Sequence, residues 1–298
     1  MCLLFVYTNP DPDDDEFSMV LVNVRDEFFH RPTKPASFWE DEPDIVGGRD
    51  QEKGREGGTW MAVSKGGRIA ALLNILQPAH RMDPTKRGRG FLVVDFIKST
   101  VDGNTYLTKL MKEKDEFNGF LFVAIEAKQV SRCSSLYCRV GSLPLQKKIS
   151  MSYYSNLQEG GPVQAEPGFY AFGNSVPPQF WAKVKYGKQK FEELIRENNR
   201  FSQKDQLLKK IYDFLDDPTS YPVDDAMRKQ SQEPESTLRL MNQMKYILPN
   251  YNYGTRTHTV LFVNGTGKAE FIEKSIKEPI DITSKIVWET KSFTFDIV

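Results

Sequence analysis

The sequence predicts an α+β fold in which two sheets pack on each other and helices lie outside them, rather than one doubly wound parallel sheet. Strand patterns fill both ends of the 298-residue chain, and helical periods occupy its middle. A chain of this length buries most of its apolar surface in one core, so we expect a single domain over residues 1–298. Residues at about 217–236 are rich in Pro, Ser, Asp and Gln, which predicts an excursion on the surface.

Short apolar runs predict four strands in the first quarter of the chain. Residues 3–6 and 19–24 flank an acidic, turn-forming stretch, which predicts an antiparallel pair. Residues 60–64 and 68–73 flank a Lys-Gly-Gly turn, which is the pattern of a hairpin. We expect these four strands to form one meander.

The rest of the chain alternates between helix and strand patterns. The apolar run 91–97 is a candidate strand, whereas apolar residues between 107 and 111 recur with the spacing of one helix face. Ser202, three residues before Asp205, resembles the capping box of a later helix. Further strands are predicted at 120–127, 135–140, 168–172, 259–264, 269–273 and 287–296, and further helices at 184–195 and 207–215.

Composition excludes several classes of protein. Basic and acidic residues number 40 each, so no overall field attracts nucleic acid or an anionic membrane. The cysteines at positions 2, 133 and 138 are too few for the disulfide framework of a secreted module. No window approaches the roughly 20 apolar residues that span a bilayer, and the apolar start is too short for an export signal. We therefore expect a cytoplasmic protein with no transmembrane segment and no nucleic-acid partner.

Cys2 is the first candidate for chemistry because it heads the first predicted strand. If Met1 is removed, one residue carries both a thiol and an α-amine, whose pKa of roughly 7.7 to 8.0 suits it to accept the thiol proton. The alternative is a small apolar residue in a buried strand. The position alone leaves both interpretations open.

Short phrases along nearly the whole chain, taken in order, carry a family resemblance. They are Met1-Cys2, Arg25-Asp26-Glu27-Phe28 with Arg31-Pro32, Gly57-Gly58-Thr59-Trp60, Asn74, Gly88-Arg89-Gly90, Asn118-Gly119-Phe120, Gly173-Asn174 and Tyr253-Gly254-Thr255-Arg256-Thr257. Together they resemble the NRDE family, whose eukaryotic branch comprises the transport and Golgi organisation 2 homologues. The chain departs from the family pattern at Val24, where the family has asparagine, and Asn23 lies on the opposite face of the strand.

The resemblance implies a four-layer αββα sandwich of the N-terminal nucleophile hydrolase type, similar to the cysteine amidases that cleave bile salts and penicillin V. Ser64 stands near the place of an oxyanion donor in those amidases. Each implied residue also has a structural alternative, such as a buried ion pair, a turn former or an anchor. The implied catalytic set is Cys2 as nucleophile, Arg25 to stabilise the thiolate, Asp26 to orient the α-amine, Asn174 as oxyanion donor, and Arg256 to support Cys2 or a substrate carboxylate.

Haem trafficking is the function that we prefer from the resemblance. The eukaryotic branch is associated with moving haem from membranes or storage organelles to acceptor proteins, with links to mitochondria and lipid metabolism. The pocket that holds the nucleophile in the related hydrolases would then bind haem as cargo. Candidate iron donors are Cys2, Cys133, Cys138, His30, His80 and His258, because thiolate and imidazole are the usual axial ligands.

Basic loops offer a counterpart for the carboxylates of haem, or for the phosphates of another amphipathic anion such as an acyl-coenzyme A. Arginine suits this task because its guanidinium grips two oxygens at once. The ligand-binding residues that we predict are Arg31, Ser64, Asn74, Arg89 and His258, with Lys34, Arg81, Lys86 and Arg87 as further cations in these loops.

Two alternative functions stay open. An amidase acting through Cys2 on a small acylated substrate would need no metal, and it predicts removal of Met1 and loss of turnover in Cys2→Ser. A protein of secretory or Golgi organisation would need no small ligand, and it predicts a large exposed apolar patch without a pocket. The resemblance associates a cytoplasmic protein with mitochondria or the Golgi.

Overall fold

The computed structural model describes residues 2–131 and 145–297, and its strands form two antiparallel sheets. The first sheet contains β1 (Leu3–Thr8), β2 (Phe17–Phe28), β10 (Gly168–Phe172), β11 (Ile247–Leu248), β12 (Tyr253–Asn264), β13 (Lys268–Ile276) and β14 (Trp288–Asp296). Six of them lie in the order β10–β1–β2–β12–β13–β14, and β11 pairs with β12. Leu3 pairs with Val24, and Thr8 with Met19, which confirms the predicted antiparallel pair.

The second sheet is a meander in sequence order. It contains β3 (Thr33–Phe38), β4 (Ile45–Asp50), β5 (Met61–Ser64), β6 (Arg68–Asn74), β7 (Phe120–Ser131), β8 (Leu145–Ser155) and β9 (Val163–Ala165). The β5–β6 hairpin is the predicted one. The prediction that β1, β2, β5 and β6 form one meander is wrong, because the first two lie in one sheet and the last two in the other. The chain changes sheets through β3 and β4, whose prolines, glycines and charges gave no strand pattern.

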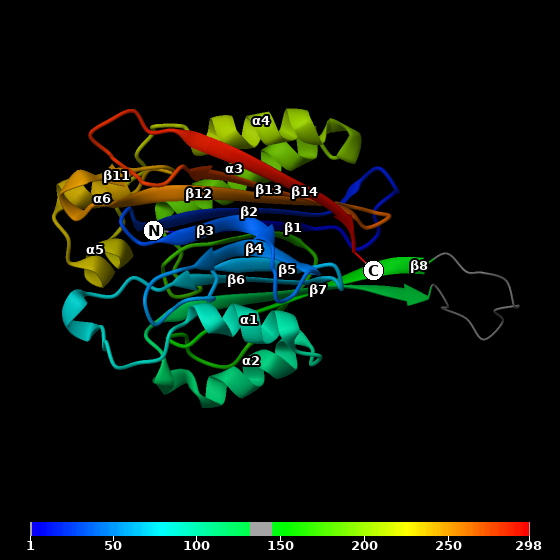
Figure 1. Cartoon of the computed structure of the whole chain (residues 1–298), viewed down its shortest axis with the longest axis horizontal. Coiled ribbons are helices and arrows are strands. Elements are labelled where there is room, and N and C mark those ends of the chain that lie inside the picture. Colours follow the sequence, from blue (N-terminus) through cyan, green and yellow to red (C-terminus); the bar gives the residue numbers. More distant parts are fainter. Residues whose placement is uncertain (1, 132–144, 298) are drawn as a thin grey trace, which may run out of the picture.

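The two sheets pack face to face between two helix layers. Leu4 and Leu21 face the core between the sheets, whereas Phe5 and Val22 face helices, because successive side chains of a strand point to opposite faces. The resulting order is helix, sheet, sheet, helix (Figure 1), so the predicted α+β class with two packed sheets is confirmed. One helix layer contains α3 (Ala182–Glu197), α4 (Lys204–Leu215), α5 (Asp225–Ser231) and α6 (Glu235–Met241), and the other contains α1 (Gly90–Lys98) and α2 (Gly103–Lys112).

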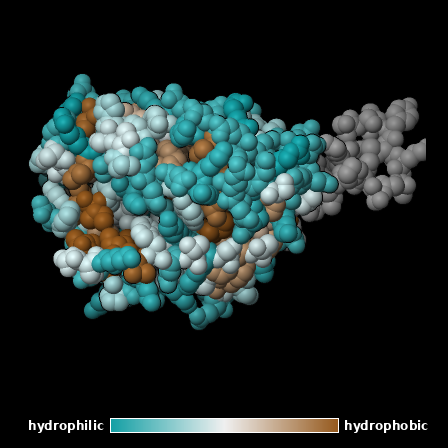
Figure 2. All heavy atoms as spheres, turned by 90° about the horizontal axis from the view of Figure 1, so that it is seen from above, coloured by the Kyte–Doolittle hydropathy of each residue, from teal (hydrophilic) through white to brown (hydrophobic). Residues whose placement is uncertain are grey.

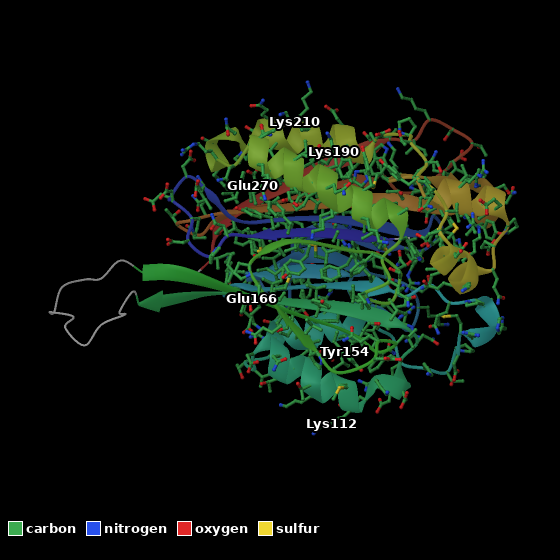
Figure 3. All side chains as sticks on the ribbon, turned by 180° about the vertical axis from the view of Figure 1, so that it is seen from behind. Lys112, Tyr154, Glu166, Lys190, Lys210 and Glu270 are labelled. Atoms are coloured by element: carbon green, nitrogen blue, oxygen red, sulfur yellow. The ribbon has the colours of Figure 1, made fainter. Side chains whose placement is uncertain are left out.

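Polar side chains dominate the outer faces of the helix layers. Lys190 and Lys210 lie on the layer of α3 and α4, and Lys112 lies at the end of α2 on the opposite side of the molecule (Figure 3). Seen from the α4 side, hydrophobic residues gather toward the end with α6 and the β13–β14 connection (Figure 2), where Val287 is 54% exposed. Within the described ranges, no helix combines the length and apolar character needed to cross a bilayer.

Residues 91–97, which we predicted as a strand, form helix α1 instead. Val93 and Phe96 are buried against β5 and β6, and Asp95 faces outward, as expected for one helix face on a sheet. Val94 is buried as well, so apolar residues cover most of this short helix and its sequence shows no clear helical period.

The predicted capping box before α4 is also wrong. The N-cap of α4 is Gln203, which makes no side-chain capping bond. The amide and hydroxyl of Ser202 donate instead to the Asp15 carboxylate, at 2.9 and 2.7 Å, and so tie this turn to the loop between β1 and β2. The predicted strand 135–140 lies outside the described residues. Short 3-10 turns are η1 (Ala79–Arg81), η2 (Lys114–Glu116), η3 (Phe201–Gln203) and η4 (Pro249–Tyr251).

The segment that we expected to be a surface excursion carries helix α5 and packs onto the domain. Asp224 caps this helix by accepting the Met227 N–H, and it also accepts the Ala182 N–H at the start of α3. The side chain of Met227 is fully buried in the core. Gln230 donates to the carbonyls of Leu76 and Asn174, at 2.9 and 2.7 Å, and thereby fastens α5 to both sheets.

Candidate functional site

A cleft of about 260 Å³ opens where the end of β2 meets the loops that follow β4 and β6. Both kinds of charge and an apolar surface line it. The cations are Arg25, Arg31, Arg55, Lys86, Arg87 and Arg89; the carboxylates are Asp26, Glu27, Asp50 and Asp83; the apolar side chains are Trp60, Leu72, Met82, Pro84 and Phe91; and Cys2 supplies a sulfur. Six of the lining residues are basic and four are acidic, and the carboxylate of one of the four, Asp26, points to the helix side of β2, so the cleft favours an anion.

The Cys2 sulfur lines this cleft and is half-buried. Its Sγ accepts the Asp26 N–H at 3.4 Å and approaches the Asp26 carbonyl at 3.7 Å. Burial raises the pKa of the Cys2 thiol, and the nearby Asp26 carboxylate acts in the same direction, whereas the charge of the α-amino group, the Asp26 N–H and the Arg25 charge oppose them. The sulfur is therefore a protonated thiol at neutral pH unless a ligand replaces the proton.

Arg25 lies beside Cys2 because both side chains point from the first sheet toward the second. Its guanidinium lies over the Trp60 ring at 4.1 Å from the ring centroid, a cation–π arrangement. It also pairs with Glu27 at 3.6 Å and donates to the Thr33 hydroxyl at 3.4 Å. These contacts hold a buried positive charge in a fixed place near the sulfur.

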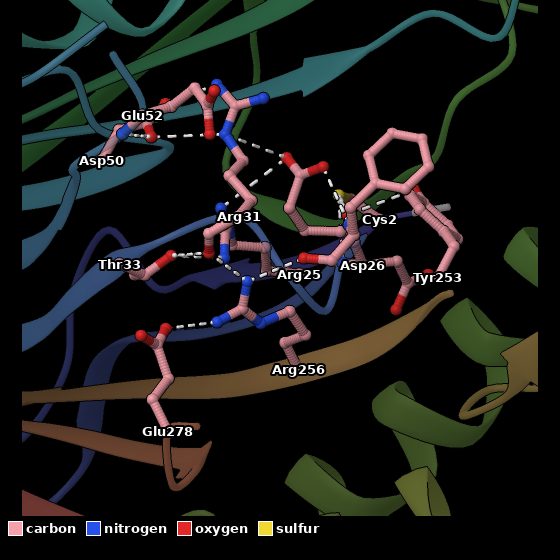
Figure 4. A network of polar contacts seen from close by, with 12 residues as sticks. Cys2, Arg25, Asp26, Arg31, Thr33, Asp50, Glu52, Tyr253, Arg256 and Glu278 are labelled. Atoms are coloured by element: carbon pink, nitrogen blue, oxygen red, sulfur yellow. Dashed lines mark hydrogen bonds and ion pairs between the residues drawn. The ribbon is translucent and has the colours of Figure 1, made fainter. Parts of the chain in front are cut away.

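Alternating charges continue from Arg25 across the cleft (Figure 4). Glu27 pairs with Arg31 at 3.7 Å, and Arg31 makes a bidentate contact with Asp50 at 3.2 and 2.6 Å. Such a fork fixes the plane of a guanidinium. The Arg31 side chain keeps 27% of its surface exposed, so one side of it faces the cleft.

Arg89 lies close to the like charges of Arg31 and Arg55. It donates to the Gly119 carbonyl at 2.7 Å, which is a neutral partner. Burial, together with the charges of Arg31 and Arg55, lowers the pKa of Arg89 to about 10, while Glu27 acts in the opposite direction. An anion bound here would relieve this repulsion.

Asp26 occupies the opposite face of the same strand, behind the sulfur. Its carbonyl accepts the Tyr253 hydroxyl at 3.1 Å. Burial and the charge and hydrogen bond of Asp26 raise the pKa of Tyr246 well above its ordinary value. Lys183 lies in the same buried layer and donates to the Met241 carbonyl at 2.8 Å.

Asn174 lies at the junction of the two sheets and does not line the cleft. Its side-chain amide donates to the Asn74 carbonyl at 2.5 Å, and its own carbonyl accepts the Leu76 N–H at 2.9 Å. Its amide protons therefore face the backbone of β6 rather than an oxyanion site. The role of oxyanion donor for Asn174 stays a prediction that needs a rearrangement.

Arg256 also lies outside the cleft, next to the backbone of the turn that follows β2. It is the extra residue of a β-bulge that interrupts the pairing of β12 with β2, and bulges re-aim side chains. Its guanidinium donates to the carbonyls of Phe28 and Arg31, at 2.8 and 2.6 Å, and pairs with Glu278 at 2.5 Å. It thus holds the turn that carries Arg31 (Figure 4).

The remaining predicted binding residues separate into two groups. Asn74 lines the cleft with Arg31 and Arg89, whereas Ser64 lies at the far end of β5 and accepts the Arg68 N–H. His258 is fully buried on the helix side of the first sheet, with ring centroids 5.3 Å from Trp288 and 6.3 Å from Tyr212. Burial lowers the pKa of His258 to about 4.

Of the candidate iron donors, Cys2 is the one that lines the cleft. His30 and His80 are exposed elsewhere, and Cys133 and Cys138 lie outside the described residues. Over residues 2–131 and 145–297, no three His, Cys, Asp or Glu side chains gather as a metal site.

Sequence reasoning missed the aromatic and charged partners of the predicted residues. Trp60 was predicted only as the start of a strand and as part of a family phrase, and Asp50, Arg55, Tyr246 and Lys183 were not singled out. A signal was present for Lys183, because it precedes Val184 and shares the buried side of α3 with Phe191 and Ile195. A lysine within such an apolar stripe is fully buried only when its ammonium group has a polar partner in the core.

Comparison with known proteins agrees with the phrases that carried the resemblance. The family model described as Transport and Golgi organisation 2 matches residues 1–278. The Transport and Golgi organization 2 homologs of Mus musculus and Homo sapiens are each 33% identical over 298 residues, covering 100% of this chain and 99% of the relative. The Drosophila melanogaster protein of that name is 28% identical over 282 residues, covering 93% and 92%. This chain therefore belongs to the Transport and Golgi organisation 2 family.

Proposed function

We propose that the cleft binds an amphipathic anion reversibly, with haem as the cargo, and passes it to acceptor proteins. The observation that carries this proposal is the cluster of Arg31, Arg55 and Arg89 beside the half-buried Cys2 sulfur. The arginines suit the carboxylates of haem, and the sulfur suits its iron.

The apolar lining suits the flat body of such a cargo. Trp60, Leu72, Met82 and Phe91 supply aromatic and aliphatic surface beside the cations, and Met82 and Phe91 are each more than one-third exposed at the rim. A ligand held by one thiolate and an open rim can leave readily. The raised pKa of the Cys2 thiol favours release, because the sulfur takes back its proton when the iron departs.

A second candidate is an N-terminal-cysteine amidase, which the placement of Cys2 and Arg25 favours. The layering of helix, sheet, sheet and helix supports a fold of the N-terminal nucleophile hydrolase type. However, Asn174 and Arg256 direct their donors to backbone carbonyls outside the cleft. Cargo binding requires no rearrangement of these residues, so we prefer it.

The names of the relatives speak of transport and Golgi organisation, which keeps a role in secretory organisation as a third candidate. An apolar surface at the α6 end would suit a protein partner (Figure 2). A role in secretory organisation would leave the cleft without a function, so we rank this candidate last.

A haemin absorbance titration tests the proposal. Wild type should give a shifted Soret band, and Cys2→Ala should lose the shift and bind at least about tenfold more weakly. Arg31→Met should weaken binding while keeping the band position, because it removes an anion contact and not the iron donor. Lys34→Met is the matched control, since Lys34 pairs with Glu40 and does not line the cleft. Equal binding by all four proteins would refute the proposal.

An amidase assay separates the second candidate. Penicillin V and glycocholate are incubated with wild type and Cys2→Ala, and the released acid or amine is measured. We expect no turnover that depends on Cys2. Turnover lost in Cys2→Ala, in a protein whose amino terminus is Cys2 by intact mass, would replace cargo binding with hydrolysis.

A further inference from the structure

A lysine lies fully buried on the far side of the strand that carries the cleft. Lys183, near the start of α3, has no exposed surface. Its Nζ donates to the carbonyls of Met241 and Gln243, at 2.8 and 3.4 Å, and lies 5.5 Å from the centroid of the Tyr246 ring. Burial lowers the pKa of Lys183 to about 8, while the negative charges of Asp26 and Cys2 act in the opposite direction.

The contacts lead from this ammonium to the sulfur through one strand. Tyr246, beneath the ammonium, makes a side-chain hydrogen bond with Asp26. Asp26 is 4% exposed, and its backbone N–H donates to the Cys2 Sγ at 3.4 Å. Tyr253 donates to the Asp26 carbonyl at 3.1 Å, so Asp26 is held through its backbone by Tyr253 and through its side chain by Tyr246.

The charged and titratable groups that influence the thiol come from several elements. Arg25 and Asp26 belong to β2, Arg89 to the loop before α1, and Tyr253 to β12. Tyr246, just before β11, and Lys183 on α3 complete the set. Of these, Lys183 is the cation on the side of the strand to which the Asp26 carboxylate points.

We infer that Lys183 is a positioning residue for Cys2, acting through Tyr246 and Asp26 to offset the Asp26 charge and so to set how readily the thiol ionises. The inference rests on the proposed role of Cys2 as the donor in the cleft. A carboxylate behind the sulfur opposes formation of a thiolate, and the ammonium compensates for it. Removal of Lys183 should therefore make the thiol harder to ionise.

A purely structural role predicts a different result. Met241 is the last residue of α6, so the Lys183 ammonium also meets the carbonyl end of that helix. If this were its whole function, substitution would reduce stability and leave the chemistry of Cys2 unchanged.

The test is the rate of Cys2 alkylation by iodoacetamide between pH 6 and pH 10. Peptide mass spectrometry separates the Cys2 peptide from those of Cys133 and Cys138. For Lys183→Met we expect alkylation at pH 7, where Lys183 of the wild type is charged, to be about tenfold slower than in wild type, which corresponds to one unit in the thiol pKa. Lys183→Arg should restore most of the rate. Lys185→Met, which changes an exposed lysine of the same helix, should follow the wild-type profile.

A second variant decides the question if Lys183→Met does not fold. Tyr246→Phe keeps the ring and removes the hydroxyl that bonds to Asp26, so the profile should again move to higher pH. Unchanged profiles in the folded variants, with reduced thermal stability, would overturn the inference. The assay contains no haem, so failure of haem binding and failure of this inference are separate results.

Discussion

The charge around Cys2 depends on the stack of Arg25 on Trp60. The guanidinium is buried, so it depends on the ring face and on Glu27 for its stabilisation. This residue pair brings the two sheets together at the cleft, because Arg25 comes from the first sheet and Trp60 immediately precedes β5 of the second.

Substitution of Trp60 tests this stack. Trp60→Leu should lower the free energy of unfolding by about 1–2 kcal/mol, because a desolvated cation–π contact is lost. Trp60→Phe keeps a ring face and should lose less than half of that amount. Urea unfolding of the three proteins measures the difference. Equal losses in Leu and Phe variants would contradict the importance of the ring face.

His258 gives a prediction about pH and stability. Burial lowers the pKa of His258 to about 4 from an ordinary value of 6.5, while the Asp216 charge opposes the shift. The unfolded chain takes up a proton below pH 6.5 that the folded chain refuses until about pH 4. The stabilisation that comes from neutral His258 is therefore complete above pH 6.5 and is lost as the pH falls toward 4.

Between pH 7 and pH 4, wild type should lose about 3 kcal/mol more of unfolding free energy than His258→Phe, which keeps an aromatic ring between Trp288 and Tyr212. Denaturant unfolding at each pH measures this difference. His80→Phe serves as control because His80 is exposed. Parallel pH curves for wild type and His258→Phe would disprove the account of this residue.

At the scale of elements, α5 acts as a clamp between the sheets. Gln230 donates to the carbonyls of Leu76, beyond β6, and Asn174, beyond β10. Composition pointed to an exposed loop here because polar residues surround the few that are buried. Asp224 and Met227 carried the relevant information, as a helix cap and a core residue, but their partners on α3 are distant in sequence.

Gln230→Leu should lower the free energy of unfolding by about 1–3 kcal/mol, because the half-buried Leu76 carbonyl loses the Gln230 donor and the Asn174 carbonyl keeps the Leu76 N–H alone. Amide hydrogen exchange should quicken at residues 74–76 and 172–174, where the clamp holds the ends of β6 and β10. Lys229→Ala, on the exposed side of the same helix, should change neither quantity. Unchanged exchange in Gln230→Leu would mean that α5 does not couple the sheets.

Strong local patterns made many elements predictable. The β1–β2 and β5–β6 pairs have short apolar runs on either side of clear turns, and β7 is an almost continuous apolar run. Helix α1 was predicted as a strand because its apolar residues follow one another almost without interruption, so the short run shows no helical period. Strands β3 and β4 were missed because their backbone pairing depends on neighbours in the sheet rather than on their own residue types.

At the scale of the molecule, the four layers explain why the predicted site divides. Side chains of β2 alternate, so Arg25 faces the cleft while Asp26 faces the helix layer with Tyr246 and Lys183. The family resemblance grouped residues by motif, and Cys2, Arg25 and Arg89, named as site residues for separate reasons, all line one cleft. It could not indicate that the bulge in β12 sends the Arg256 guanidinium to the backbone of the turn after β2.

The central claim is that the Cys2 sulfur and the arginines beside it form one cargo site. Protection of Cys2 from iodoacetamide by saturating haemin tests it most directly, with peptide mass spectrometry following each cysteine. We predict that haemin slows the alkylation of Cys2 at least about tenfold in wild type, and that Arg31→Met weakens this protection at subsaturating haemin. An unchanged rate of Cys2 alkylation in the presence of bound haemin would contradict the account.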